Sequence, residues 1–412
     1  MNNEEKLIKM LKYVSEHNDF YKNRIKEYGI TNPLDITQWP ILTRKELQEN
    51  RYNMFSDGYK TKYFYQQLHR QTSSGFSGIP VNVYWDYRDL YSSNLSLWRK
   101  RYKNYHISPK DRCVMFNLYS FNSCSNNRDV LYSVSPNNLL QINISLIHYD
   151  KKYEKVIELI DKFQPDWLYI QPFVLNKLID AYVSLSIIPP KSLRYIESFG
   201  EILLDDLKSK ARSLFNIPIV NMYGSEEMNG IAYECSWGVM HILDDNVFVE
   251  IKHNGNSLIG KGESIISNLN NYAMPLIRYN QGDIIEIEKS STCYCGEYSR
   301  SVKLIDGRKL ESIIIAEDKE LTAFMLMEVM AEVNNLYKDI ITDYSFIFHR
   351  LTCRLECLVN IKNIRWLESV KTSVLRVFSS KIDSDNLIFD VNVAQKENIL
   401  LRKQRIINFQ ND

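Results

Sequence analysis

Residues 165–185 read PDWLYIQPFVLNKLIDAYVSL, and this stretch decides the fold class. Its first part is a short apolar run between prolines, which predicts a buried strand, and the rest repeats apolar residues at helical spacing. The same order continues on both sides. A predicted helix, YEKVIELIDKF, precedes the stretch, and SLRYIESFG, LDDLKSKARSLF and IPIVNMYG follow as strand, helix and strand. Alternating strands and helices predict a mostly parallel sheet with helices on its faces.

The N-terminal segments extend this prediction. Residues 4–27 alternate apolar and charged positions at helical spacing, and Thr43 and Glu46 have the spacing of a capping box that opens a short helix. Two extended segments, residues 62–70 and 81–85, are expected on either side of a polar loop.

The C-terminal segments have a different pattern. After Gly230 the sequence is β-like and rich in hairpins, and from about Lys309 it has the pattern of a small α+β module. We therefore expect an α/β fold in two domains. The first, residues 1–308, has mixed, mostly parallel sheets flanked by helices and a β-rich region at about 231–305. The second, residues 309–412, is small and α+β.

The charge balance bears on the class of partner to expect. The chain has 412 residues with 51 basic and 50 acidic side chains, a net charge of +1. This balance gives no reason to expect nucleic acid or an anionic membrane as a partner. A helix expected over residues 87–104 leads into the basic stretch WRKRYKNYH, which we interpret as a solvated helix face.

No apolar run reaches the roughly 20 residues that span a bilayer. The N-terminal segment reads as a charged helix and not as a secretory leader, so a cytoplasmic location is expected. The seven cysteines form an odd, uneven set, which suggests buried thiols and a metal site more than a disulfide framework.

The polar loop, RQTSSGFSGIP at residues 70–80, is rich in hydroxyl side chains and glycine. Such a loop after a strand offers backbone N–H groups and hydroxyls to phosphate oxygens, and its glycines let the backbone approach closely. It lacks the Walker pattern. The alternative interpretation is a polar surface turn.

Three later motifs carry charge at the ends of predicted strands. MYGSEEMNG places Glu226 and Glu227 after a Tyr-Gly turn, where a carboxylate can hold Mg²⁺ and so phosphates. PLIRYNQGDIIEI places Asp283 where it can accept hydrogen bonds from two ribose hydroxyls. Arg308, in LIDGRKLE, is a cation for a nucleotide phosphate or ribose. The alternative for either glutamate alone is a solvated charge.

In this order the motifs resemble those of the adenylate-forming superfamily of acyl-CoA ligases, and more closely the branch of phenylacetate-CoA ligases and capsular-polysaccharide-associated ligases. SGFSGIP is similar to the family's phosphate loop, SFGE to its G-x-E segment, YGSEE to Y-G-x-[ST]-E, YNQGD to Y-R-x-G-D and Gly307-Arg308 to the hinge. Departures are Ile79 for lysine, Phe76 and Glu226 for hydroxyl residues, and Asn280 for arginine.

The resemblance implies an AMP-forming acid–thiol ligase. ATP and Mg²⁺ would activate a carboxylic acid, with an aromatic acid as the default, to an acyl-adenylate with release of pyrophosphate, and coenzyme A would then accept the acyl group. It also implies that the C-terminal domain is mobile. The implied nucleotide-binding residues are Thr72, Ser73, Ser74, Gly75, Ser77, Gly78, Gly200, Glu201, Tyr223, Gly224, Asp283 and Arg308, with Glu227 on Mg²⁺.

The resemblance also implies a lysine near the chain end that contacts the carboxylate and the α-phosphate. LLRKQRIINF offers Arg402 or Lys403, and we choose Lys403. Ser198 and Phe199 of SFGE are implied substrate-binding residues. In PDWLYIQPF we assign Trp167 to the core and Tyr169 to the acyl pocket.

Four residues of the β-rich region have metal-ligand character. Cys235 and His241 are spaced C-x5-H, and Cys293 and Cys295 are spaced C-x-C before a glycine. Three cysteines and one histidine form a closed tetrahedral set suited to structural zinc. His253 is the substitute ligand if His241 is wrong, and four separate residues are the alternative.

Other functions stay open at this point. The acyl group could pass to an acyl carrier protein or an amine instead of coenzyme A, and the chain could be a catalytically degenerate, zinc-stabilised binding protein. Ile79 and the absence of a glycine before Lys403 favour the degenerate alternative. The oligomeric state is not fixed by the sequence, with a homodimer among the options.

Overall fold

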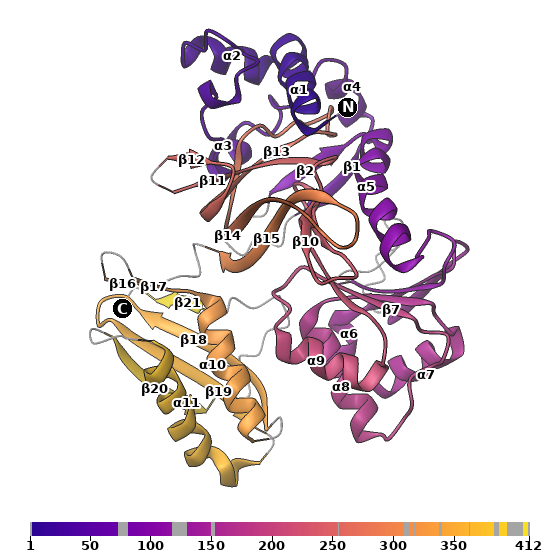
Figure 1. Ribbon diagram of the computed structural model, residues 1–412, viewed down its shortest axis with the longest axis vertical. Coiled ribbons are helices and arrows are strands. Elements are labelled where there is room, and N and C mark those ends of the chain that lie inside the picture. The colour runs from indigo at the N-terminus through magenta and orange to yellow at the C-terminus, as the bar shows by residue number, and fades with distance from the viewer. Residues whose placement is uncertain are drawn as a thin grey trace. The chain divides into compact units, whose positions relative to one another are not determined.

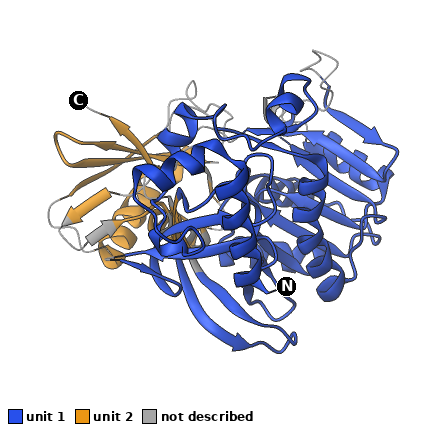
Figure 2. Ribbon diagram, turned by 90° about the horizontal axis from the view of Figure 1, so that it is seen from above, with its two compact units in different colours: residues 1–75, 79–281, 285–304 blue, residues 76–78, 282–284, 305–412 orange. Residues whose placement is uncertain are grey.

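The computed structural model describes residues 2–72, 81–117, 130–149, 153–253, 255–308, 313–316, 319–337, 340–361, 363–382, 387–393 and 407–410. The chain divides into two compact units, drawn in different colours in Figure 2. Unit 1 contains residues 1–75, 79–281 and 285–304, and unit 2 contains residues 76–78, 282–284 and 305–412.

Unit 1 begins with short helices. The first four are α1 (Asn3–His17), α2 (Asp19–Glu27), α3 (Arg44–Glu49) and α4 (Tyr59–Phe64), with a 3-10 turn at Ile36–Gln38. Side chains cap the N-termini of α1, α2 and α3. Thr43 and Glu46 form the expected capping box at the start of α3, because each side chain accepts from the other residue's backbone N–H. The hairpin of β1 (His69–Thr72) and β2 (Asn82–Trp85) and the long helix α5 (Tyr87–Tyr105) follow.

The predicted parallel strands lie in one sheet of unit 1. In sequence order its elements are β3 (Cys113–Asn117), β4 (Tyr132–Ser135), β5 (Leu139–Asn143), α6 (Ile144–Tyr149), α7 (Tyr153–Phe163), β6 (Trp167–Ile170), α8 (Pro172–Ser184), β7 (Tyr195–Phe199), α9 (Asp205–Phe215) and β8 (Ile219–Ser225). The neighbours β5, β3, β6, β7 and β8 pair in parallel, and β4 adds an antiparallel edge.

The β-rich region continues this sheet instead of forming an appended one, because β9 pairs with β8 in antiparallel register. The strands of the region are β9 (Asn229–Glu234), β10 (Met240–Ile242), β11 (Val247–Lys252), β12 (Asn256–Ser257), β13 (Gly260–Asn268), β14 (Tyr279–Thr292) and β15 (Tyr298–Arg308). The whole sheet has the order β12-β11-β13-β14-β15-β10-β9-β8-β7-β6-β3-β5-β4. Its parallel half therefore meets its antiparallel half at β8 and β9.

Helices cover both faces of the parallel half (Figure 1). One apolar cluster joins Leu168, Ile170 and Ile196 of the strands to α7, α8 and α9, and a second joins Trp167 and Tyr195 to α5. Because side chains alternate along a strand, neighbouring residues of β7 belong to different clusters. The core thus lies on both sides of the sheet and holds the strand ends rigidly.

Unit 2 is an α+β module. Its sheet has the order β20-β19-β18-β21, from β18 (Ile341–His349), β19 (Arg354–Ile361), β20 (Ile388–Val393) and β21 (Ile407–Gln410). The helices α10 (Ala323–Leu336) and α11 (Leu367–Lys381) share an apolar cluster with these strands, and β16 (Ile313–Ala316) pairs with β17 (Lys319–Leu321).

One local prediction differs from the structure. Residues 62–70 were expected to be extended, but α4 runs to Phe64 and the strand begins only at His69. Residues 407–410, for which no element was predicted, form β21, parallel to β18. Among the described residues no helix is both long and apolar enough to cross a membrane.

Candidate active site and metal centre

The predicted phosphate loop is the connection of the β1–β2 hairpin. Thr72 ends β1 opposite Asn82, and its Oγ1 donates to Asn82 Oδ1 at 2.8 Å. Thr72 is exposed. The remaining loop residues of the prediction, Ser73, Ser74, Gly75, Ser77 and Gly78, lie outside the described residues.

Glu227 is buried just beyond β8, where the parallel and antiparallel halves of the sheet meet. Its side chain is only 4% exposed. Its Oε1 lies 3.5 Å from Arg44 Nη1 and accepts a hydrogen bond from the Tyr279 hydroxyl at 3.3 Å. Within the described residues Oε2 has no protein partner. A buried carboxylate with one oxygen available is a suitable ligand for a hard divalent cation.

The Tyr-Gly turn before Glu227 is tightly fixed. The Tyr223 hydroxyl accepts a hydrogen bond from Gln281 Nε2 at 2.7 Å, which joins β8 to the first residues of β14. At Gly224 a Cβ atom would lie 2.4 Å from the Asn229 carbonyl oxygen, so this close approach requires glycine. Asp283 is a buried residue of β14 that directly follows Gly282, whose φ is 85°.

The predicted substrate residues lie at the carboxyl ends of β6 and β7. The rings of Tyr169 and Phe199 are stacked, with centroids 3.8 Å apart and planes 3° apart. Ser198 is fully buried, and its hydroxyl has no hydrogen-bond partner among the residues that the structure describes. The carboxyl ends of parallel strands are where α/β sheets bind ligands.

The turn after β7 orients the two remaining residues of SFGE. Gly200 has a φ of 79°, which favours glycine, and it turns the chain away from the strand. Glu201 Oε2 accepts a hydrogen bond from the Phe173 backbone N–H at 3.1 Å, in the first turn of α8. Glu201 therefore links the end of β7 to α8.

A buried ion pair behind the aromatic stack was missed from the sequence. Arg101 was assigned with its basic neighbours to a solvated face, which is wrong, because it is buried and bonds twice to the fully buried Glu197. The guanidinium also lies 5.6 Å from the Tyr169 ring centroid. Burial acts to lower the pKa of Arg101, but the Glu197 carboxylate outweighs it and raises that pKa. A single buried arginine in a run of four cations leaves no periodic signal that would identify it.

The four predicted metal ligands lie together. The ligand atoms of Cys235, His241, Cys293 and Cys295 are all within 4.8 Å of one another. The Cys235 and Cys293 sulfurs are 3.8 Å apart, and Cys295 Sγ lies 3.3 Å from His241 Nε2. Burial lowers the pKa of His241, which favours the neutral imidazole that binds metals, and raises the pKa of Cys235 to about 12. Without a cation nearby, that thiol would therefore stay protonated.

A hydrogen bond and an ion pair with neighbouring residues hold this cluster in place. His241 Nδ1 lies 2.7 Å from Ser299 Oγ, which fixes the ring so that Nε2 is left for a metal. The neighbouring Glu297 forms an ion pair with Lys100 of α5. His253, the alternative ligand, is not one of the grouped residues.

The side chains of two predicted site residues lie outside the described part of the structure. Arg308 ends β15, but its side chain is not among the described ones, and Lys403 lies outside the described residues together with Arg402.

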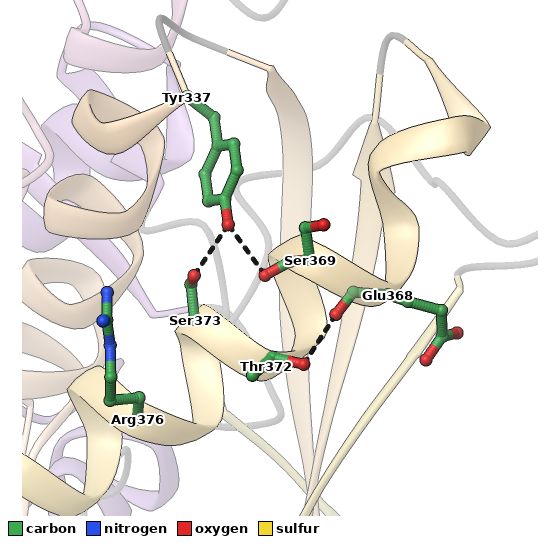
Figure 3. Close-up of a pocket in the computed structure, with 6 residues that line it drawn as sticks. All are labelled: Tyr337, Glu368, Ser369, Thr372, Ser373 and Arg376. Carbon is green, nitrogen blue, oxygen red and sulfur yellow. Dashed lines mark hydrogen bonds between the residues drawn. The ribbon is translucent and has the colours of Figure 1, made fainter.

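A hollow of about 400 Å³ lies on the surface of unit 2, between α11 and Tyr337 (Figure 3). The Tyr337 hydroxyl donates to the Ser369 carbonyl at 2.9 Å and lies 2.8 Å from Ser373 Oγ. Thr372 Oγ1 donates to the Glu368 carbonyl at 2.8 Å. None of the sequence-predicted site residues lines this hollow, and the hydroxyls of Tyr337, Ser373 and Thr372 bond to one another or to the helix backbone.

Comparisons with known proteins agree on one superfamily. No model of a protein family matches the chain. The chain is 23% identical to the protein CapK of Staphylococcus aureus over 334 residues, which is 78% of this chain and 71% of CapK. It is 22% identical to a phenylacetate-coenzyme A ligase of Pseudomonas putida over 336 residues, which is 76% of this chain and 71% of that ligase.

Among solved structures, a 2-hydroxyisobutyryl-CoA ligase in complex with an acyl-AMP aligns with a TM-score of 0.76 at 14% identity, over 100% of this chain and 89% of that one. An anthranilate CoA ligase aligns with a TM-score of 0.54 at 12% identity, over 82% of this chain and 65% of that one. These structures share the fold. Taken with the sequence similarity to CapK and to the phenylacetate-coenzyme A ligase, they support the adenylate-forming superfamily.

Proposed function

We propose that this protein is an AMP-forming acid–thiol ligase. It activates a carboxylic acid to an acyl-adenylate at the expense of ATP and then transfers the acyl group to a thiol such as that of coenzyme A. The observation that carries the proposal is Glu227, a buried carboxylate that accepts from the Tyr279 hydroxyl at the junction of the two halves of the sheet. The relatives that are ligases, and the neighbours solved with acyl-AMP and coenzyme A, support it.

In the first step an oxygen of the substrate carboxylate forms a bond to the α-phosphorus of ATP. The bond from that phosphorus to the oxygen that bridges to the β-phosphate breaks, and pyrophosphate leaves with the electron pair. The protein has to align the two anions and neutralise the charge that builds up on phosphorus. We assign the phosphate contacts to the loop from Thr72 to Gly78 and the ribose to Asp283.

Glu227 fits a divalent cation, since one of its oxygens has no partner among the described residues. Magnesium bound there would neutralise phosphate charge. At the other end of the reacting pair, we assign Lys403 to the carboxylate and the α-phosphate. In the second step the thiol sulfur bonds to the acyl carbon, and the bond from that carbon to the phosphate oxygen of AMP breaks. AMP leaves with the electron pair, and the thiol proton passes to water.

Between the two steps we propose that unit 2 changes its orientation through residues 309–311. Relatives solved in postadenylation and thioester-forming states support an alternation of this kind. The stacked pair of Tyr169 and Phe199 is the proposed wall of the acyl pocket. Its flat, apolar surface favours a planar acid over a highly polar one.

The cysteine–histidine cluster is proposed to hold structural zinc. A tetrahedral ion with Zn–S bonds of about 2.3 Å requires sulfur–sulfur distances of about 3.8 Å. The Cys235–Cys293 separation is 3.8 Å. Three cysteines and one histidine fill all four positions, so this zinc would stabilise the β9–β10 and β14–β15 turns and would not activate water.

The test is ATP–pyrophosphate exchange with a panel of carboxylic acids. We expect exchange with at least one acid and its loss in Glu227→Gln, which keeps the size of the side chain. A wild-type protein that binds ATP in calorimetry but exchanges pyrophosphate with no acid would favour the degenerate binding protein over the ligase.

A further inference from the structure

We infer that Arg44 and Tyr279 are positioning residues for Glu227: they hold its Oε1 from two sides and reserve Oε2 for the divalent cation of the nucleotide complex. The inference rests on the proposed function. Neither residue belongs to the nucleotide- or substrate-binding set predicted from the sequence.

Both contacts fall on the same oxygen. Arg44 Nη1 lies 3.5 Å from Oε1, and the Tyr279 hydroxyl donates to Oε1 at 3.3 Å. The Glu227 side chain is 4% exposed, and that of Arg44 is 18% exposed. A charge pair this well buried is screened little by solvent, so the two contacts restrict rotation of the carboxylate. The carboxylate is therefore fixed before any cation arrives.

Arg44 is placed by a rigid local structure. It is the first residue of α3, directly after the Thr43–Glu46 capping box. Glu46 also accepts a hydrogen bond from the buried Arg24 at 2.5 Å. Arg24 Nη2 lies 3.3 Å from the Ile41 carbonyl oxygen, so the segment that leads into α3 is clamped to α2. The N-terminal helices thus have a task beyond packing, which is to present Arg44.

Tyr279 is placed by the same segment. Leu42 donates its N–H to the Arg278 carbonyl at 2.9 Å and accepts from the Asn280 N–H at 2.9 Å, a short parallel bridge opposite Tyr279. Arg278 has a φ of 51°, which is uncommon for a residue with a side chain. Backbone strain of this kind persists only where the surroundings impose it.

The strain at Arg278 is held by buried partners. Its guanidinium donates from Nε to Glu250 Oε2 at 3.0 Å and from Nη1 to the Trp39 carbonyl at 2.5 Å. One bridge therefore sets the register of both residues that touch Glu227. Arg44 lies two residues after Leu42, and Tyr279 stands opposite Leu42 in the bridge.

This arrangement is that of a metal-binding carboxylate oriented by outer contacts. Loss of such contacts typically weakens metal binding or activity about 10- to 100-fold. A purely structural ion pair would behave differently, because its loss would lower stability and leave the effect of the metal on nucleotide affinity unchanged.

The test is the metal-dependent gain in nucleotide affinity, measured by calorimetry with a non-hydrolysable ATP analogue. The gain is the Kd in EDTA divided by the Kd in Mg²⁺. We expect it to fall about 10- to 100-fold in Arg44→Gln and by a smaller factor in Tyr279→Phe, while Arg44→Lys keeps most of it. The matched control is Lys45→Gln, since the neighbouring Lys45 side chain is 82% exposed.

The inference would be overturned if Arg44→Gln and Tyr279→Phe are both folded by circular dichroism and show the same metal-dependent gain in affinity as the wild type. If Arg44→Gln does not fold, Tyr279→Phe and Arg44→Lys decide alone. A wild-type protein without any gain overturns the inference together with the metal assignment. The gain could be present in the wild type and smaller in these variants while no acid supports pyrophosphate exchange. That result would support the inference and remove only the proposed activity.

Discussion

Arg101 donates two hydrogen bonds to Glu197, from Nε to Oε2 at 2.8 Å and from Nη2 to Oε1 at 2.6 Å, inside the protein. The Tyr195 hydroxyl donates to the same carboxylate at 2.6 Å, and the Tyr233 hydroxyl lies 2.6 Å from that of Tyr195. Because the single proton of Tyr195 goes to Glu197, Tyr233 donates to Tyr195. The network joins α5, β7 and β9 directly behind the proposed acyl pocket.

Removing one charge of this pair should be strongly destabilising. Glu197→Gln leaves the Arg101 charge buried without its counterion, and we expect a loss of about 3–5 kcal/mol in the free energy of unfolding. Denaturant titration measures this loss. The control is Glu158→Gln, which breaks an exposed pair with Lys155 and should cost at most about 1 kcal/mol. Equal losses of unfolding free energy in the two variants would show that the buried pair stabilises the protein no more than the exposed pair does.

The aromatic stack predicts a specific effect on acid recognition. Phe199→Ala removes the partner of Tyr169 and should raise the KM for the acid about tenfold, equivalent to about 1.4 kcal/mol of lost contact. The KM for ATP should stay near the wild-type value. Steady-state kinetics measure both constants, with Phe64→Ala as the control because that ring is 75% exposed. A change confined to the KM for ATP would place the stack outside the acyl pocket.

The metal cluster predicts zinc content and stability together. Protein purified without chelator should contain about one zinc per chain, and Cys293→Ser should lose the metal and lower the unfolding temperature. Cys353→Ser is the control, since Cys353 is an exposed, free cysteine that is not among the grouped residues. Metal analysis by mass spectrometry would check the zinc content, and thermal melts would check the stability. A wild-type protein without zinc, and a Cys293→Ser variant that melts at the wild-type temperature, would contradict the assignment.

Asp89 predicts a pH dependence of stability. Burial raises the pKa of its carboxyl to about 6, even though its Oδ2 accepts from the Tyr272 N–H at 2.9 Å. The folded state therefore holds this proton more tightly than the unfolded state does. The contribution is full below about pH 4 and is lost as the pH rises through 6.

The variant Asp89→Asn tests this dependence, because an amide can keep the Tyr272 contact but does not ionise. We expect it to be more stable than the wild type at pH 8 and no more stable at pH 4. Urea titrations at the two pH values would decide, and a stability difference that does not change with pH would contradict the role of Asp89.

Local pattern predicted much of the fold. The apolar spacing of residues 153–215 gave α7, β6, α8, β7 and α9, because these segments bury one face or stripe against a common core. The Thr43–Glu46 capping box was also visible, since it depends on residues three apart. The extended conformation predicted for residues 62–64 was wrong. Its aromatic residues prefer strands, but they lie in the short helix α4, because tertiary context can override local preference.

The site was predictable as residue types but not as contacts. Cysteine spacing indicated the residues that the structure groups as candidate metal ligands, and the Tyr-Gly turn indicated the buried Glu227. The Arg44–Glu227 pair was not visible, because it joins α3 to the end of β8 and depends on the bridge at Leu42. Arg101 was hidden for the same reason. Its buried partner Glu197 lies in a strand whose register with the sheet is set by long-range pairing.

The central claim is that the protein makes an acyl-adenylate, and its most direct test is mass spectrometry of the product formed from ATP, Mg²⁺ and a mixed pool of carboxylic acids. We predict a product with the mass of one acid joined to AMP, together with pyrophosphate, in the wild type and none in Glu227→Gln. ATP binding without any acid–AMP product in the wild type, across aromatic and aliphatic pools, would contradict the account.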